Sequence, residues 1–139
     1  MRDNPPVTER MVAPFRAHND MVWDGEVVRC ATMAHHANLG GGIHGGVLAA
    51  MLDAVMGGNV ILGLPADKMA VTSSMTVNYL RAGRIGDTLV ASAVVRKLGR
   101  SLAYADGTVT VEGSDAPVAT ATGVFAIIRR PTPDPLVRF

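Results

Sequence analysis

An apolar run at residues 45–60 constrains the fold of this chain more than any other feature. Its apolar residues recur at the three- and four-residue spacing of an α-helix, and the run is too long for one strand. After it the pattern changes to β-rich segments that have Gly, Asp or Pro at their junctions. These segments are 70–80, 87–99, 101–113 and 117–130, and a further strand is expected at 24–33, after an Asp-Gly turn.

One long helix and several strands predict an α+β domain in which the helix covers an antiparallel sheet. The chain has 139 residues, enough for one such domain and too few for two. Residues 5–17 show weak helical spacing after two prolines. We therefore expect an N-terminal segment over 1–24, the α+β domain over 25–130, and a loose C-terminal tail over 131–139.

Composition and charge exclude several classes of function. Thirteen basic residues against twelve acidic ones give a net charge of +1, which provides no electrostatic footprint for a nucleic acid. A single cysteine, Cys30, rules out an internal disulfide and fits a reducing compartment, so a cytoplasmic protein is expected. No secretion signal and no stretch near the ~18 apolar residues of a membrane span are recognised, so no membrane association is expected.

The apolar run carries a single charge, Asp53. At about 100° per residue, Asp53 shares a helix face with small residues: Gly46, Ala49, Ala50 and Gly57. A face of small residues indicates that another element, a subunit or a ligand approaches closely. The carboxylate is then paired with an arginine of a neighbouring strand, solvated in a cleft, or used in chemistry.

The entrance to this helix is the sequence His44-Gly45-Gly46. No Ser, Thr or Asp precedes Gly45, so the first N–H groups of the helix are expected to lack a side-chain partner. They would be free to receive a substrate oxygen, and the helix dipole would favour negative charge on it. The alternative is a tight turn that needs glycine.

A metal site is not expected near this entrance. It would require His35, His36 and His44 to converge with Asp53, and adjacent histidines on a strand face opposite sides. Asn38, earlier in the same loop, could be a residue that tolerates left-handed backbone geometry.

Taken together, these residues form a more specific pattern than any one of them. Asn38, the His44-Gly45-Gly46 triplet and Asp53, nine residues after the histidine, resemble the signature of hotdog-fold acyl-CoA thioesterases of the phenylacetyl-CoA (PaaI-like) type, in the 4-hydroxybenzoyl-CoA thioesterase superfamily. Residues 71–95 are similar to two strands of that family, with counterparts for Thr72 and for 79–81. The resemblance covers about residues 25–128.

This resemblance implies the hotdog fold, a long helix wrapped by an antiparallel sheet, for residues 25–130. It implies homodimers that pair edge to edge, often two of them in a homotetramer, with active sites at the dimer interface. The implied reaction is hydrolysis of an aromatic or short- to medium-chain acyl-CoA to the free acid and CoA. No metal and no cofactor are implied, since CoA is part of the substrate.

The resemblance also implies a role for each residue of the pattern. Asp53 would be the general base toward a water, or a nucleophile that forms an anhydride. The Gly46 N–H would polarise the thioester carbonyl. Asn38 would orient the water, His44 would order the loop and contact the thioester, and Thr72 of the facing subunit would hold the water or Asp53.

Substrate-binding residues are expected around these groups. Gly45 would let the carbonyl approach the backbone, and the CoA phosphates would meet arginine or lysine side chains. The candidates are Arg81, Arg84, Lys97 and Arg100, for which an ordinary solvated surface is the alternative. Candidate walls for the acyl group are Met51, Val55, Met56 and Met75.

Three other functions fit parts of the pattern. A hotdog hydratase or dehydratase acts on similar thioesters, but its expected spacing between Asp and His is not found. A non-catalytic acyl-CoA-binding module has no need for a carboxylate such as Asp53 beside the thioester. A purely structural homo-oligomer would leave the glycine-rich entrance unexplained.

Overall fold

The computed structural model describes residues 13–132. Residues 1–12 and 133–139, which include half of the predicted N-terminal segment and most of the C-terminal tail, lie outside the described residues. The elements are α2 (Pro14–His18), β1 (Met21–Trp23), β2 (Val28–Ala31), the 3-10 helix η1 (Ala34–His36), α3 (Gly45–Leu62), β3 (Lys68–Tyr79), β4 (Thr88–Leu98), β5 (Leu102–Val111) and β6 (Pro117–Arg129).

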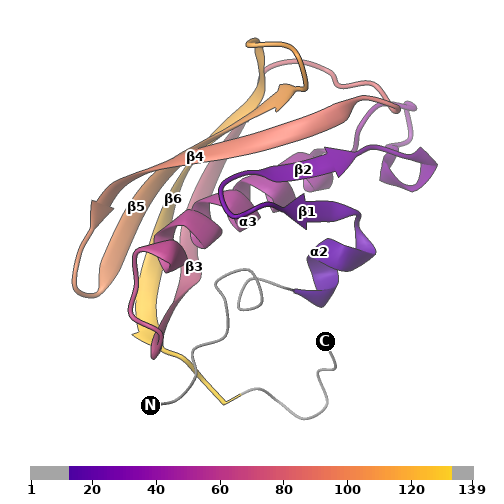
Figure 1. The fold of residues 1–139 in the computed structure, drawn as a ribbon. Coiled ribbons are helices and arrows are strands. Elements are labelled where there is room, and N and C mark those ends of the chain that lie inside the picture. The colour runs from indigo at the N-terminus through magenta and orange to yellow at the C-terminus, as the bar shows by residue number, and fades with distance from the viewer. Residues whose placement is uncertain (1–12, 133–139) are drawn as a thin grey trace.

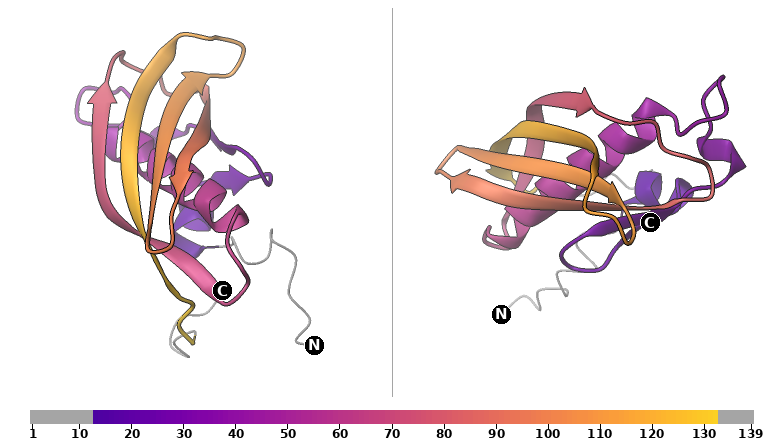
Figure 2. Two further views of the ribbon diagram at one scale, coloured as in Figure 1. Left: turned by 90° about the vertical axis from the view of Figure 1, so that its left-hand side faces the viewer. Right: turned by 90° about the horizontal axis from the view of Figure 1, so that it is seen from above.

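The strands form one antiparallel sheet in the order β1-β2-β4-β5-β6-β3. The sheet curves around α3, which crosses its concave face (Figures 1 and 2). This arrangement confirms the predicted α+β fold with one helix covering an antiparallel sheet. The helix expected at 45–60 and the four later strands lie within a few residues of their predicted bounds.

The first part of the sheet differs from the prediction of one strand at 24–33. The Asp24 carboxylate accepts hydrogen bonds from the Glu26 and Val27 amides, and Gly25 has a φ of +99°, so residues 24–27 form a turn. β2 is therefore confined to Val28–Ala31, and β1 pairs with it before the turn. The sheet thus begins at Met21, ahead of residue 25.

The core lies between α3 and a sheet surface of small side chains. The residues of α3 that face the sheet are Val47, Leu48, Met51, Leu52, Val55, Met56, Gly58 and Val60. Buried sheet residues opposite them include Ala91, Ala103, Ala105, Gly107, Ala119, Ala121 and Gly123. A Cβ at Gly107 would lie 3.0 Å from Leu52 Cδ2 and 3.1 Å from Met56 Cγ. Small residues let the helix approach the sheet closely, which explains a core with few aromatic side chains.

One expectation about this helix was wrong. Over Gly45–Leu62 the mean hydropathy is 1.6, so by length and composition alone α3 could cross a membrane. The prediction that no stretch approaches such a span therefore fails for this segment. Its bulky side chains are buried against the sheet, and the core helix of a globular domain has the same composition.

A β-bulge in β3 determines which of its side chains face α3. Thr72 lies opposite Phe125 of β6, and Ser74 lies opposite Val124, so Ser73 is the extra residue. Beyond the bulge, Met75 lies opposite Gly123 on the concave face. The bulge therefore lets Thr72 and Met75, which an unbroken alternation would send to opposite faces, both face the helix.

Candidate active site

Asp53 is half-buried in the middle of α3 and contacts the strand beside it. The Thr72 hydroxyl donates a hydrogen bond to Asp53 Oδ1 at 2.5 Å. Thr72 was expected to come from the facing subunit; instead it lies in the same chain, because β3 runs alongside α3. Among residues 13–132, no ion pair involves Asp53, so the alternative of an arginine partner on a neighbouring strand is not what holds this carboxylate.

Gly57, one of the small residues on the Asp53 face, is approached closely by the sheet, as predicted, and so is Gly45, which lies outside that face. A Cβ at Gly45 would lie 3.3 Å from Tyr79 Cε1, and a Cβ at Gly57 would lie 3.3 Å from Phe125 Cε1. The Tyr79 hydroxyl also donates to the Gly45 carbonyl oxygen at 3.1 Å. Tyr79 therefore holds the start of α3, a role that its sequence neighbourhood did not single out.

The helix entrance corrects the expectation of uncapped N–H groups. His44 is the N-cap, and its Nδ1 accepts a hydrogen bond from the Gly46 amide at 2.8 Å. Histidine is not among the preferred N-cap residues, which is why the sequence did not reveal the cap. Since Nδ1 is the acceptor, the neutral His44 ring carries its proton on Nε2. The Gly46 N–H is thus already bonded, whereas no acceptor for the Gly45 N–H is found within residues 13–132.

Asn38 organises the loop that leads to this entrance. Its Oδ1 accepts from the Gly40 amide at 2.9 Å and from the Gly42 amide at 3.0 Å, and its backbone N–H donates to the Gly42 carbonyl at 2.8 Å. The positive φ in this loop belongs to Gly41 and not to Asn38, so left-handed geometry is not the reason for the asparagine. The observed contacts of Asn38 make it a loop-positioning residue.

The adjacent histidines lie on η1 and not on a strand, so the reason given against a metal site was wrong. The rings of His35 and His36 are 4.0 Å apart, and one nitrogen of each lies near an Asp20 oxygen. However, His36 Nδ1 accepts the Met33 amide at 2.9 Å, so its Nε2 carries the proton and donates to the Asn19 carbonyl at 2.9 Å. That Nε2 therefore has no lone pair for a metal.

Cys30 is buried beneath this group. Its pKa is raised because burial disfavours the thiolate, and the Asp20 carboxylate raises it further. A thiol of this kind is a weak nucleophile at neutral pH, so Cys30 does not compete with Asp53 for a chemical role.

The four basic candidates for CoA contacts separate into two pairs. Arg84 forms an isolated β-bridge with Gly42 of the entrance loop, and Arg81 follows Tyr79 after the end of β3. The other two lie at the opposite end of α3, where Leu98 packs on Gly63; they are Lys97 and Arg100. Of these four candidates, Arg81 and Arg84 lie at the helix entrance of the same chain.

Most of the apolar residues suggested as walls of the acyl pocket lie in the core. Three of them are fully buried between α3 and the sheet, and so face no cavity: Met51, Val55 and Met56. Met75 is partly buried against the core.

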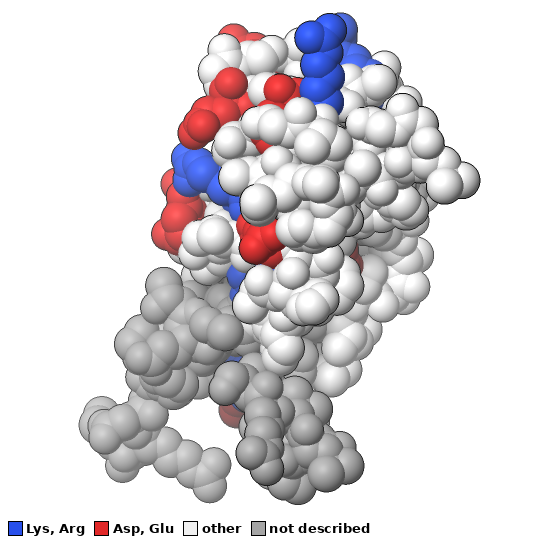
Figure 3. All heavy atoms as spheres, turned by 90° about the vertical axis from the view of Figure 1, so that its right-hand side faces the viewer, with Lys and Arg blue, Asp and Glu red and all other residues white. Residues whose placement is uncertain are grey.

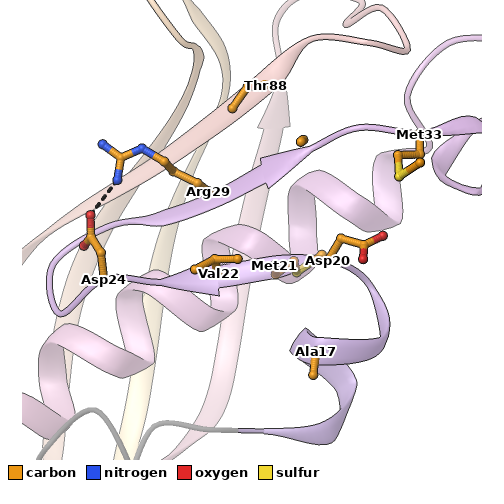
Figure 4. A pocket seen from close by; sticks show the side chains of 9 residues that line it. Ala17, Asp20, Met21, Val22, Asp24, Arg29, Met33 and Thr88 are labelled. Atoms are coloured by element: carbon orange, nitrogen blue, oxygen red, sulfur yellow. Dashed lines mark hydrogen bonds and ion pairs between the residues drawn. The ribbon is translucent and has the colours of Figure 1, made fainter.

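Two of the surface cavities formed by residues 13–132 lie near α2 and β1. One, of about 260 Å³, adjoins the helix entrance. The other, of about 620 Å³, is an open groove over β1 and β2, and an ion pair between Arg29 and Asp24 lies on its wall (Figure 4). The larger groove contains none of the residues of the predicted site.

The sequence matches the family described as the thioesterase superfamily over residues 40–117. The chain belongs to the thioesterase superfamily. A Pseudomonas aeruginosa protein named as an esterase is 31% identical over 90 residues, which span 65% of this chain and 66%, about two thirds, of that protein. Membership places the chain among hydrolases that act on thioester bonds.

Solved structures agree with this membership. A Bacillus halodurans protein crystallised with CoA is 30% identical, with a TM-score of 0.77 over 86% of this chain and 80% of that one. The Escherichia coli PaaI protein, from the phenylacetic acid degradation operon, is 26% identical, with a TM-score of 0.74 over 86% of this chain and 88% of that one. The hotdog fold and the PaaI-like resemblance of this thioesterase superfamily member are thereby confirmed.

Proposed function

We propose that this chain hydrolyses acyl-CoA thioesters to the free acid and CoA, with Asp53 as the catalytic carboxylate. The observation that carries the proposal is the Asp53 side chain itself: half-buried on α3, held at Oδ1 by Thr72, and without a cationic partner in residues 13–132. Such a carboxylate keeps one oxygen for proton transfer. The CoA bound to the Bacillus halodurans protein supports an acyl-CoA substrate.

A complete site requires two copies of the chain. Asp53 follows Gly45 by eight residues, so at 1.5 Å per residue the two lie about 12 Å apart along α3. One thioester carbonyl cannot contact both groups in one chain. β3 is an edge strand within the described sheet, and its residues 71–74 are exposed, so a second copy can pair there. A homodimer, or a dimer of dimers, would bring the Asp53 of one chain to the helix entrance of the other.

The helix entrance supplies the donors for the thioester carbonyl. The Gly45 N–H replaces the Gly46 N–H in this role, because the latter bonds to His44. The same bond leaves the His44 Nε2–H as a second donor in the neutral ring. Both would stabilise the negative charge that develops on the carbonyl oxygen.

Asp53 then acts on a water molecule. Oδ2 accepts a proton as the water oxygen bonds to the carbonyl carbon, and the resulting tetrahedral intermediate expels the sulfur of CoA. The C–S bond breaks, and the departing thiolate takes the proton back from Asp53. Direct attack by Asp53 would give an anhydride that water then hydrolyses. Neither route needs a metal or a cofactor, because a thioester is already activated.

Arg81 and Arg84 are the residues we assign to the CoA phosphates, since both lie at the end of α3 where the carbonyl would bind. Lys97 and Arg100 could serve only a site whose other residues come from a second chain. We expect an aromatic or a short- to medium-chain acyl group, and a cytoplasmic protein.

The test is release of free thiol from acetyl-, hexanoyl-, benzoyl- and phenylacetyl-CoA by the wild-type protein and by Asp53→Asn. We expect Asp53→Asn to lower kcat about 10²- to 10⁴-fold. Asp115→Asn, at an exposed turn, is the matched control and should keep full activity.

Three outcomes would overturn the proposal. Full activity of Asp53→Asn would remove the carboxylate from the mechanism. Binding of acyl-CoA without turnover by the wild type would instead support a binding module. Addition of water to an enoyl-CoA, without thiol release, would support a hydratase.

A further inference from the structure

The cavity of about 260 Å³ begins at the helix entrance. His44 and Gly46 form one part of its wall, and Ala50 forms another. Ala50 lies one turn after Gly46 and three residues before Asp53 on the same side of α3. The cavity therefore opens beside the groups to which the proposed function assigns the thioester carbonyl.

The rest of the wall is mixed, with slightly more apolar than polar surface. Phe15 of α2, Met21 of β1 and Val47 of α3 contribute hydrocarbon surface. The polar groups of the wall are largely bonded to one another or to the backbone: His36 Nε2–H donates to the Asn19 carbonyl, and Asn19 Nδ2 donates to the Phe15 carbonyl, both at 2.9 Å.

Within residues 13–132, this wall offers no free cation to a charged group. His35, the remaining ring at the rim, has its Nε2 2.9 Å from the Asp20 carboxylate. An acyl tail that ends in a carboxylate would lose its hydration here without gaining a partner. Figure 3 shows this side of the molecule: uncharged atoms make up much of the described surface, and acidic and basic side chains gather along its left and upper parts.

We propose that this cavity is the acyl pocket and that it selects compact, uncharged acyl groups, aliphatic or with a single aromatic ring. This inference rests on the proposed function, because it assumes that the thioester carbonyl binds at the helix entrance. A volume of about 260 Å³ lies below the range of about 300–1,000 Å³ for pockets that enclose drug-sized ligands, which excludes long chains.

Two residues set the limits of this pocket. Ala50 is half-buried in the wall, so a larger side chain there projects into the cavity and shortens it. Phe15 is 61% exposed and lies on the α2 side, so its removal opens the cavity outward. The two substitutions should therefore shift acyl preference in opposite directions.

The experiment compares kcat/KM for acetyl-, hexanoyl-, benzoyl-, decanoyl- and succinyl-CoA in Ala50→Leu, Phe15→Ala and the wild type. In the wild type, hexanoyl- and benzoyl-CoA should exceed decanoyl- and succinyl-CoA. Ala50→Leu should lower kcat/KM for hexanoyl- and benzoyl-CoA about tenfold or more relative to acetyl-CoA. Phe15→Ala should raise the relative rate for decanoyl-CoA. Val22→Ala, exposed on β1 outside this cavity, should leave the profile unchanged.

If both variants change kcat/KM by the same factor for all acyl groups, the proposed acyl pocket is wrong, but the proposed thioesterase activity still stands. If the wild type hydrolyses no acyl-CoA, the proposed function fails. The pocket is then tested by the binding of acyl-CoA analogues instead of by their hydrolysis. Thioether analogues of acetyl- and hexanoyl-CoA are then titrated by calorimetry. Weaker binding of the hexanoyl analogue alone to folded Ala50→Leu supports the pocket, and unchanged binding of both overturns it.

Discussion

The Thr72 hydroxyl donates to Asp53 Oδ1, which leaves Oδ2 of the carboxylate free to take a proton. Thr72→Val removes this donor while nearly conserving the side-chain volume. A hydrogen bond to a charged group contributes about 1.5–3 kcal/mol, so kcat for acyl-CoA hydrolysis should fall about 10- to 100-fold. Thr72→Ser, which keeps the hydroxyl, should retain most of the activity. Full activity of Thr72→Val together with a loss in Thr72→Ser, measured by thiol release, would show that packing of the threonine methyl matters and not the hydrogen bond.

The two roles of His44 can be separated by substitution. His44→Ala removes both the cap of Gly46 and the Nε2–H donor, so stability should fall by about 1 kcal/mol and activity should fall with it. His44→Ser restores an N-cap without an imidazole. It should recover the unfolding free energy in urea but not kcat. If His44→Ser has full activity, His44 is only a cap.

The close contact between α3 and the sheet predicts that replacing Gly107 by a larger residue destabilises the protein. In Gly107→Ala the new Cβ would press on Leu52 and Met56, which are fully buried and have little room to move. We expect a loss of about 1–3 kcal/mol in the unfolding free energy, measured in urea. Ser92→Ala, on the outer face of β4, should change it by less than about 0.5 kcal/mol. Wild-type stability of Gly107→Ala would contradict the close approach.

The turn before β2 predicts a pH-dependent contribution to stability. The Val27 amide, together with the Glu26 amide and the Arg29 guanidinium, holds the pKa of Asp24 below its ordinary value. A carboxyl with a lowered folded-state pKa stabilises the fold above its unfolded pKa of about 4, and this is lost as the pH falls through the folded pKa. Asp24→Asn mimics the protonated acid. Its stability deficit, measured in urea, should therefore be present at pH 7 and shrink below about pH 4. A deficit that does not change with pH would contradict this account.

The sequence predicted the elements whose patterns are long. The periodicity of 45–60 and the β-rich segments after residue 70 were sufficient for α3 and for β3 to β6, because burial of one face imposes a repeat over many residues. β1, over Met21–Trp23, is too short to show a repeat.

The site was predicted less completely, because its details depend on contacts between distant segments. His44 is a cap that no sequence rule signals. Because His44 accepts the Gly46 amide, the amide left for a substrate is that of Gly45 and not that of Gly46. Thr72 reaches Asp53 within the same chain because of how β3 packs against α3, which one sequence does not reveal. The cavity beside Ala50 is formed by α2, β1 and η1, segments with weak or no patterns of their own.

The bulge at Ser73 has a consequence for how this edge of the sheet can change. Deleting Ser73 would restore an uninterrupted two-residue alternation. Because Ser74 would then follow Thr72 directly, Met75, Val77 and Tyr79 would still face α3, as they do now. Tyr79 would keep its hydrogen bond to the Gly45 carbonyl. An insertion of one residue between Ser74 and Tyr79 would instead turn Tyr79 toward the outer face of the sheet. Among relatives of this chain, the interval between Thr72 and Tyr79 should therefore be as long as here or one residue shorter, while the residues within it vary.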